Sequence, residues 1–170
     1  IDVPTIRYFR FASTFVLGTE VRQALRMPLG EEMVTKLRTL AEETRVWDAE
    51  VDTQWVAWRL RARLEEAMAA LREEPQSAEK VGHVEGVLSA AAAFGLTLEL
   101  WGAQNEFARM ARRLAPGAAP VAGPALAAAE GTPGLTRVEL RRLQRIGERL
   151  NFAVAAFLPD DIVSDPPPVQ

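Results

Sequence analysis

Apolar residues recur along most of this chain every three to four positions, which is the spacing of one face of an α-helix. No segment shows a convincing alternation of apolar and polar residues at the two-residue period of a half-buried strand. Glycine and proline residues separate the periodic segments from one another. The pattern therefore predicts an all-α protein, an irregular bundle of about six helices with a loop rich in Pro, Gly and Ala before the last of them.

The first helix is expected to begin at Pro4, a residue suited to a first helical turn, and to run to Leu17. We expect Gly18 to break it, and Thr19 to cap a short continuation through Leu25. Its inward spacing is traced by Ile6, Phe9 or Arg10, Ser13, and Val16 to Leu17, while Phe11 and Phe15 add a second apolar edge.

Four more helices are expected before residue 115, each with its own start or stop signal. Their expected spans are 31–47, a long helix capped by Asp48 or Asp52 and ending near Glu74, a helix capped by Ser77 and ending at Gly95, and 98–114. The residues expected to face inward in the first three of these are Met33, Val34, Leu37, Leu40, Ala41, Ala57, Leu60, Leu64, Ala67, Met68, Leu71, Val81, Val84, Leu88 and Ala91.

Small residues recur every four positions in the helix capped by Ser77, at Gly82, Gly86 and Ala90. Such a strip lets a neighbouring helix come close, although each glycine costs roughly 0.5–1 kcal/mol of helix stability relative to alanine. We therefore expect another helix to pack against this strip.

Composition changes abruptly at residues 115–134, where Ala, Gly and Pro dominate, and this stretch is expected to be a linker or long loop. Thr136 and Glu139 then form the pattern of a capping box, which opens a last helix expected to reach Phe157. The expected organisation is a helical bundle at 1–114, the linker at 115–134, a helix packing on the bundle at 135–158, and a mobile tail at 159–170.

Charge and composition exclude several classes of function. The net charge of −3 removes the general attraction to nucleic acid, and no apolar run approaches the length of a membrane span. The chain has no cysteine, which fits a reducing compartment, and we expect a cytoplasmic protein. Because it begins at Ile1 with neither an initiator Met nor a signal peptide, we expect it to be part of something longer.

No constellation of catalytic residues or metal ligands is visible in the sequence. His83 is the only histidine, which rules out a two-histidine metal site, and no glycine-rich loop has a phosphate-binding form. We therefore predict no catalytic residue, no metal site and no cofactor in this chain. A stripe of arginines in the last helix, spaced by four, either binds an acidic partner or forms a solvated face: Arg137, Arg141, Arg145 and Arg149, with Arg142 beside them.

Three tryptophans cluster around one expected helix–helix turn. Trp55 and Trp58 are three positions apart and share a helix face, and the turn brings Trp47 near them. They form either a hydrophobic minicore at one end of the bundle or a half-exposed aromatic platform for a sugar ring or another apolar surface.

The segment LELWGAQNEF, residues 98–107, contains the sharpest candidate for a binding site. Trp101, Gln104 and Asn105 are related by three and four positions, so their side chains leave one side of a helix. An indole beside two neutral amides suits sugar hydroxyls well and phosphates poorly, because each amide both donates and accepts hydrogen bonds. The open alternative is that the two amides satisfy buried backbone groups at a helix junction.

Two stretches resemble a large bacterial family whose members join a barrel related to family-57 glycoside hydrolases to a C-terminal helical region of unknown function. One is FVLxxxxRxAL, which runs from Phe15 to Leu25, and the other is LWxAQN, which runs from Leu100 to Asn105. The resemblance covers about residues 3–114. It places this chain in the helical region of an alpha-amylase- or alpha-mannosidase-like protein.

The resemblance implies an accessory domain in carbohydrate metabolism that is not catalytic alone, attached to a parent protein whose own activity stays open. Its implied partners are the catalytic barrel of the same parent chain and an α-glucan, with Trp101, Gln104 and Asn105 lining the sugar cleft. A face that packs on the barrel would favour a homo-oligomer when the piece is isolated. The alternative is a non-enzymatic helical module that binds another protein and never meets sugar.

Overall fold

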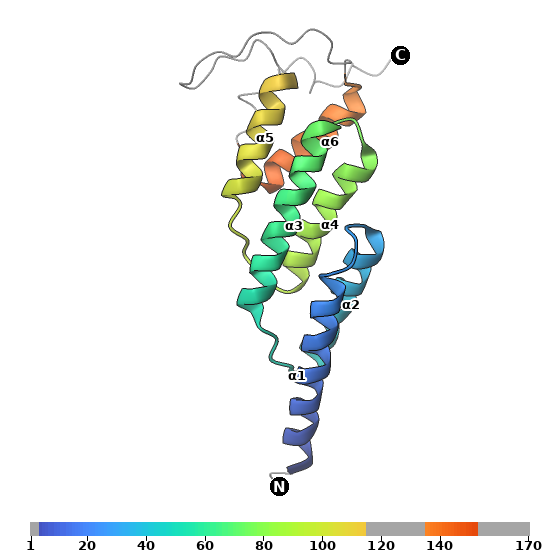
Figure 1. Cartoon of the computed structure of the whole chain (residues 1–170), viewed down its shortest axis with the longest axis vertical. Coiled ribbons are helices and arrows are strands. Elements are labelled where there is room, and N and C mark those ends of the chain that lie inside the picture. The colour runs from blue at the N-terminus through green and yellow to red at the C-terminus, as the bar shows by residue number, and fades with distance from the viewer. Residues whose placement is uncertain (1–3, 115–134, 153–170) are drawn as a thin grey trace, which may run out of the picture. The chain divides into compact units, whose positions relative to one another are not determined.

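The computed structural model describes residues 4–114 and 135–152, and these residues form six α-helices without a strand among them (Figure 1). The all-α prediction is therefore confirmed. The expected loop at 115–134, the tail at 159–170 and the last expected residues of the final helix lie outside the described residues. The helices are α1 Pro4–Ala24, α2 Glu31–Val46, α3 Thr53–Glu73, α4 Ala78–Ala93, α5 Trp101–Leu114 and α6 Arg137–Arg149.

The chain divides into two compact units, and the boundaries between them fall within α3, within α4 and in the connection between α4 and α5. The first unit comprises Ile1–Ala67 and Gly82–Glu99, and the second comprises Met68–Val81 and Leu100–Gln170. Among the described residues, none of the helices is both long and apolar enough to cross a membrane.

Aliphatic side chains form the core of the first unit, where α1 and α2 pack on each other. Each fully buried large apolar side chain contributes roughly 1.5–3 kcal/mol to stability. The buried stripes of α3 and α4 run through Val56 and Val87, so the expected inward residues Ala57 and Leu88 lie at the edges of those stripes and are partly exposed. The buried residues of this unit are Leu17, Val21, Ala24, Leu25, Met33, Leu37, Leu40, Ala41, Val56, Leu60, Leu64, Ala67, Val84, Val87, Ala90 and Ala91.

Helix α1 runs without interruption through Gly18, so the expected break there is wrong. The Thr19 hydroxyl donates a hydrogen bond of 2.9 Å to the Phe15 carbonyl one turn back and does not cap a new helix. Gly18 has only its intrinsic propensity cost, about 1 kcal/mol, and Val21 and Leu25 anchor the following turns in the core. Tertiary packing thus outweighs the local signal.

Three helices end in the same way, with a residue in the left-handed conformation just past the last turn. These residues are Asp48 after α2, Gly95 after α4 and Asn151 after α6, with φ values of 48°, 66° and 53°. In each case the amide of the next residue donates to a carbonyl five positions back, as from Phe152 to Gly147 at 2.9 Å, which satisfies carbonyls left open by the helix end.

These helix ends decide between the two expected caps of α3 and correct the expected end of the last helix. Asp48 closes α2 and does not cap α3; the cap is Asp52, whose carboxylate accepts a 3.0 Å hydrogen bond from the Trp55 amide. The last helix ends at Arg149 and does not continue to Phe157, because Asn151 turns the backbone out of the helix.

The second unit has a smaller core, built where α5 and α6 meet the end of α3 and the start of α4. The rings of Phe107 and Phe152 contact edge to face at 5.1 Å, and Arg72 of α3 pairs with Glu106 of α5 at 2.6 Å. Together they tie α5 to its neighbours. The buried residues of this unit are Met68, Leu71, Val81, Ala103, Phe107, Ala108, Met110, Ala111, Leu143, Ile146 and Leu150.

The expected capping box at the start of α6 is confirmed. The Thr136 hydroxyl accepts from the Glu139 amide, and the Glu139 carboxylate accepts from the Thr136 amide at 2.7 Å. Two hydrogen bonds lower the pKa of Glu139 below its ordinary value. The larger effect comes from the Thr136 backbone amide and the smaller from the Thr136 hydroxyl.

A lowered pKa in the folded state means that Glu139 stabilises α6 above its unfolded-state pKa and loses this contribution as the pH falls through the folded-state value. We expect Glu139→Gln to lower the melting temperature at neutral pH and to have a smaller effect in acid. Thermal unfolding of both proteins at the two pH values measures this difference. An equal effect at both pH values would contradict the role of the carboxylate.

Candidate functional site

Trp101 is the first residue of α5, and its side chain is 73% exposed. The buried residues of α5 include Ala103, Phe107 and Met110, which lie on the opposite side of the helix. The indole therefore adds little to the core of the second unit and presents most of its surface to solvent.

Gln104 has a structural role. Its side-chain amide donates a 2.7 Å hydrogen bond to the carbonyl of Leu150, the residue that caps the end of α6. The row of side chains that includes Gln104 leads to buried Phe107 and Ala111, so Gln104 lies at the border of the core. Of the two interpretations of the Gln104 amide, the structural one is therefore correct: the amide satisfies a backbone group at a helix junction.

Asn105 is half-buried one helical turn beyond Trp101, on the same side of α5. Within residues 4–114 and 135–152 its side-chain amide has no hydrogen-bond partner. The structure thus brings together an exposed indole and an available amide, and it assigns the third member of the predicted group to the α5–α6 junction.

The described residues contain no group of three or more His, Cys, Asp or Glu that could hold a metal ion, and none of the buried side chains among them is polar or charged. Besides Glu139, whose pKa is lowered by the capping box, two ion pairs show resolved pKa shifts: a hydrogen bond from Lys36 to Glu20 raises the lysine pKa, and one from Arg72 lowers the pKa of Glu73.

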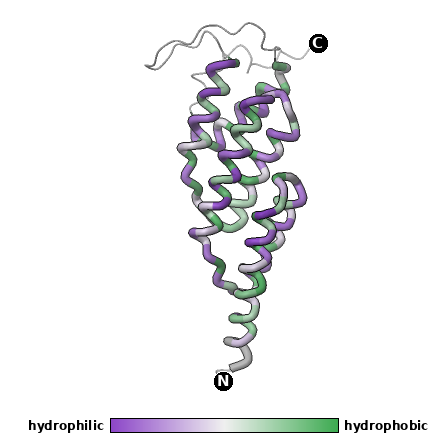
Figure 2. The backbone as a smooth tube through the Cα atoms, viewed as in Figure 1, coloured by the Kyte–Doolittle hydropathy of each residue, from purple (hydrophilic) through white to green (hydrophobic). Residues whose placement is uncertain are grey.

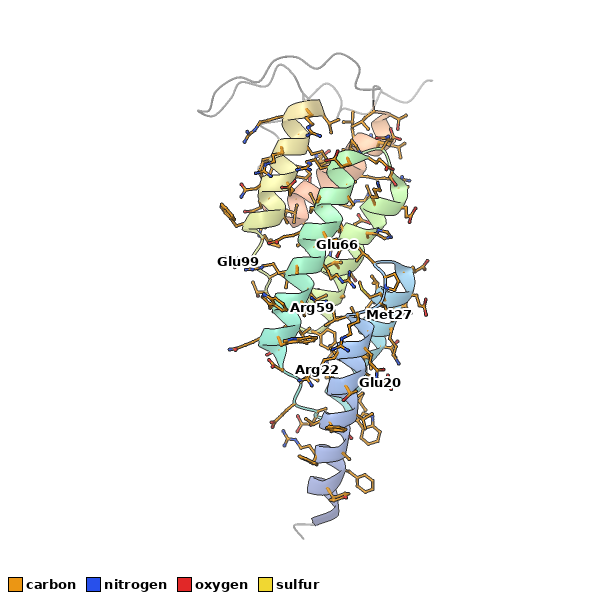
Figure 3. The ribbon with its side chains drawn as sticks, viewed as in Figure 1. Glu20, Arg22, Met27, Arg59, Glu66 and Glu99 are labelled. Carbon is orange, nitrogen blue, oxygen red and sulfur yellow. The ribbon has the colours of Figure 1, made fainter. Side chains whose placement is uncertain are left out.

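The three tryptophans of the predicted platform differ in their surroundings. Trp47 and Trp58 are more than half exposed, so the minicore reading is wrong for these two. Trp55 is half-buried, with the Arg22 guanidinium 5.7 Å from its ring centre, and Arg59 lies 5.6 Å from the ring centre of Trp58 (Figure 3). The hollow that Trp55 lines beside Arg22 is too small for more than one water molecule.

A larger aromatic surface lies on α1, and the sequence reasoning assigned it no function. Five large apolar side chains on its N-terminal half are between 53% and 77% exposed: Tyr8, Phe9, Phe11, Phe15 and Val16. Figure 2 shows this half of α1 as largely hydrophobic. We call these five residues the α1 aromatic face. The sequence signal for this surface was the second apolar edge of the helix. A helix that buries only one face leaves such an edge exposed.

Comparison with protein-family models, with curated proteins and with solved structures finds no match to this chain.

Proposed function

We propose that this chain is a helical accessory module of a carbohydrate-active, glycoside hydrolase-like bacterial enzyme, and that it contacts an α-glucan through Trp101 and Asn105. The observation that carries the proposal is an exposed indole beside an amide that has no hydrogen-bond partner among residues 4–114 and 135–152, on one side of a well-anchored helix. An aromatic ring provides a flat apolar surface for one face of a sugar, and the amide provides a donor and an acceptor for its hydroxyls.

The rigidity of α5 supports this role. The Gln104–Leu150 hydrogen bond, the Arg72–Glu106 pair at 2.6 Å and the contact of Phe107 with Phe152 hold the helix in place. A side chain on such a helix loses little conformational freedom when a ligand binds. In this proposal the module is not catalytic alone, it packs on the catalytic barrel of its parent, and it works in the cytoplasm.

The proposal predicts that Trp101→Ala weakens binding of soluble maltooligosaccharides at least tenfold. Because the side chain is exposed, the same substitution should leave stability within about 0.5 kcal/mol of the unchanged protein. Isothermal titration calorimetry measures the affinity, and urea unfolding measures the stability. Trp58→Ala is the matched control, since it removes another half-exposed indole.

Two results separate the proposal from its alternative. If the unchanged protein shows no heat of binding, or if Trp58→Ala has the same effect as Trp101→Ala, the contact at Trp101 is refuted. The second candidate function, a module that binds another protein, is favoured by a different observation, the α1 aromatic face in the first unit.

A further inference from the structure

Residues 8–16 of α1 pack little of their surface. From Tyr8 to Val16 there is no buried residue, and the buried stripe of the helix begins at Leu17. Thr14 and Arg10 hold this segment to the connection between α2 and α3: the Thr14 hydroxyl accepts from the Glu50 amide at 3.1 Å, and Arg10 pairs with Glu50 at 2.9 Å. The α1 aromatic face lies on the other side of the helix.

The Ser13 and Thr19 hydroxyls beside this face already have partners within the helix, so their burial costs little. The Ser13 hydroxyl donates to the Phe9 carbonyl at 2.8 Å, and the Thr19 hydroxyl donates to the Phe15 carbonyl. Between residues 8 and 16 the one charged side chain is Arg10, which turns toward Asp48 and Glu50. A surface with this composition favours an apolar occupant.

We propose that the α1 aromatic face is the interface of a symmetric homodimer, in which α1 packs antiparallel against α1 of a second copy. A twofold axis between positions 11 and 12 places Tyr8 opposite Phe15 of the other copy, and Phe11 opposite Ala12. The Phe11 ring then meets the small, exposed Ala12, as interdigitated packing requires, and the rings of Tyr8 and Phe15 face each other. The face is thus complementary to itself.

The exposed area of the α1 aromatic face is large enough for an interface with a second copy of the chain. Given their exposed fractions, the four rings and Val16 present on the order of 600–700 Å² per copy. Two copies would therefore bury at most about 1,200–1,400 Å² in total, which lies at the lower end of the range of specific protein–protein interfaces. The inference rests on the first unit alone and does not depend on the proposed sugar contact at Trp101.

Sedimentation velocity over a wide range of protein concentration tests the proposal. We expect the unchanged chain to show a concentration-dependent monomer–dimer equilibrium, and Phe11→Glu to be monomeric throughout. Trp58→Glu is the matched control, because it places the same charge on an exposed aromatic position outside α1 and should leave the dimer intact. Circular dichroism of the variants checks that the helices are retained.

A cross-linking experiment locates the axis, because the natural chain has no cysteine. Ala12→Cys should form an intermolecular disulfide rapidly on mild oxidation, whereas Gln23→Cys, at an exposed position farther along α1, should not. A chain that stays monomeric at every concentration, or a dimer that persists in Phe11→Glu, overturns the proposal. Trp101→Ala should still dimerise and Phe11→Glu should still bind glucan, so each of the two proposals can fail without the other.

Discussion

Replacing Arg63 by alanine is expected to lower the free energy of unfolding by about 2–4 kcal/mol. The Arg63 side chain is only 15% exposed and donates to two backbone carbonyls just past the end of α1, that of Leu25 at 3.2 Å and that of Met27 at 2.6 Å. It also pairs with Glu66 at 2.9 Å (Met27 and Glu66 are labelled in Figure 3). Its loss leaves part-buried carbonyls without a donor.

Arg61→Ala is the matched control, two positions away on the same helix. Arg61 pairs with Glu99 at 2.6 Å, but its side chain is 38% exposed and competes with water for its partners, so its loss should cost less than about 1 kcal/mol. The loss of unfolding free energy for Arg63→Lys should fall between the losses for the two alanine variants, because an ammonium keeps the charge and lacks the guanidinium fork. Urea unfolding measures all three. Equal losses for Arg63→Ala and Arg61→Ala would show that the carbonyl contacts contribute little.

Replacing Gly86 by alanine is expected to destabilise the protein by about 1–3 kcal/mol, although alanine is the better helix former. A Cβ atom at this position would lie 2.6 Å from the Cγ2 atom of Val34 on α2. Val34 is β-branched and stiff, so α2 and α4 would have to shift to accept the methyl group. In a double-mutant cycle with Val34→Ala, most of this cost should disappear.

Gly82→Ala and Gly18→Ala are the controls for this prediction. Both glycines are inside helices, and within the described part of the chain a Cβ atom built at either position meets no other atom within 4 Å beyond its own helix backbone and chain neighbours. Each substitution should stabilise the protein by roughly 0.5–1 kcal/mol, through helix propensity alone. If Gly86→Ala also stabilised the protein, the close approach of α2 and α4 would be contradicted.

The two glycines of α4 show how far the sequence could predict this packing. Their four-residue spacing correctly indicated a close approach of another helix, which occurs at Gly86. It could not show that Gly82 faces open space, because the spacing is the same for both residues and the position of α2 decides between them. The capping box at Thr136 and the Gly95 helix end were predictable for the opposite reason: their signals are local.

The candidate site shows the same difference between what local sequence signals predict and what long-range packing decides. The spacing of Trp101, Gln104 and Asn105 correctly put them on one helix, and it left open whether the amides face a ligand or the backbone. That choice depends on where α6 ends, since Gln104 bonds to the Leu150 carbonyl, and the position of that end follows from the left-handed conformation of Asn151. Asn151, which lies 47 positions after Gln104 in the sequence, thus decides the role of the Gln104 amide.

The aromatic residues of α1 could not be placed from hydrophobicity. The expected inward positions were Phe9 or Arg10, and Val16 to Leu17; of these Leu17 is buried, whereas Phe9 and Val16 are exposed. Apolar periodicity shows that a helix has an apolar face but does not show whether the same chain covers that face. On α1 the covered face begins only at Leu17, where α1 enters the core of the first unit.

The central claim, that α5 presents Trp101 and Asn105 to a sugar, is tested most directly by nuclear magnetic resonance. The chain has four tryptophans, and each gives its own indole N–H signal. On titration with a maltooligosaccharide, we expect the Trp101 indole and the Asn105 side-chain amide to shift together, while the signals of Trp47, Trp55 and Trp58 stay in place. If no indole signal moves, or if Trp47 or Trp58 moves and Trp101 does not, the claim is contradicted.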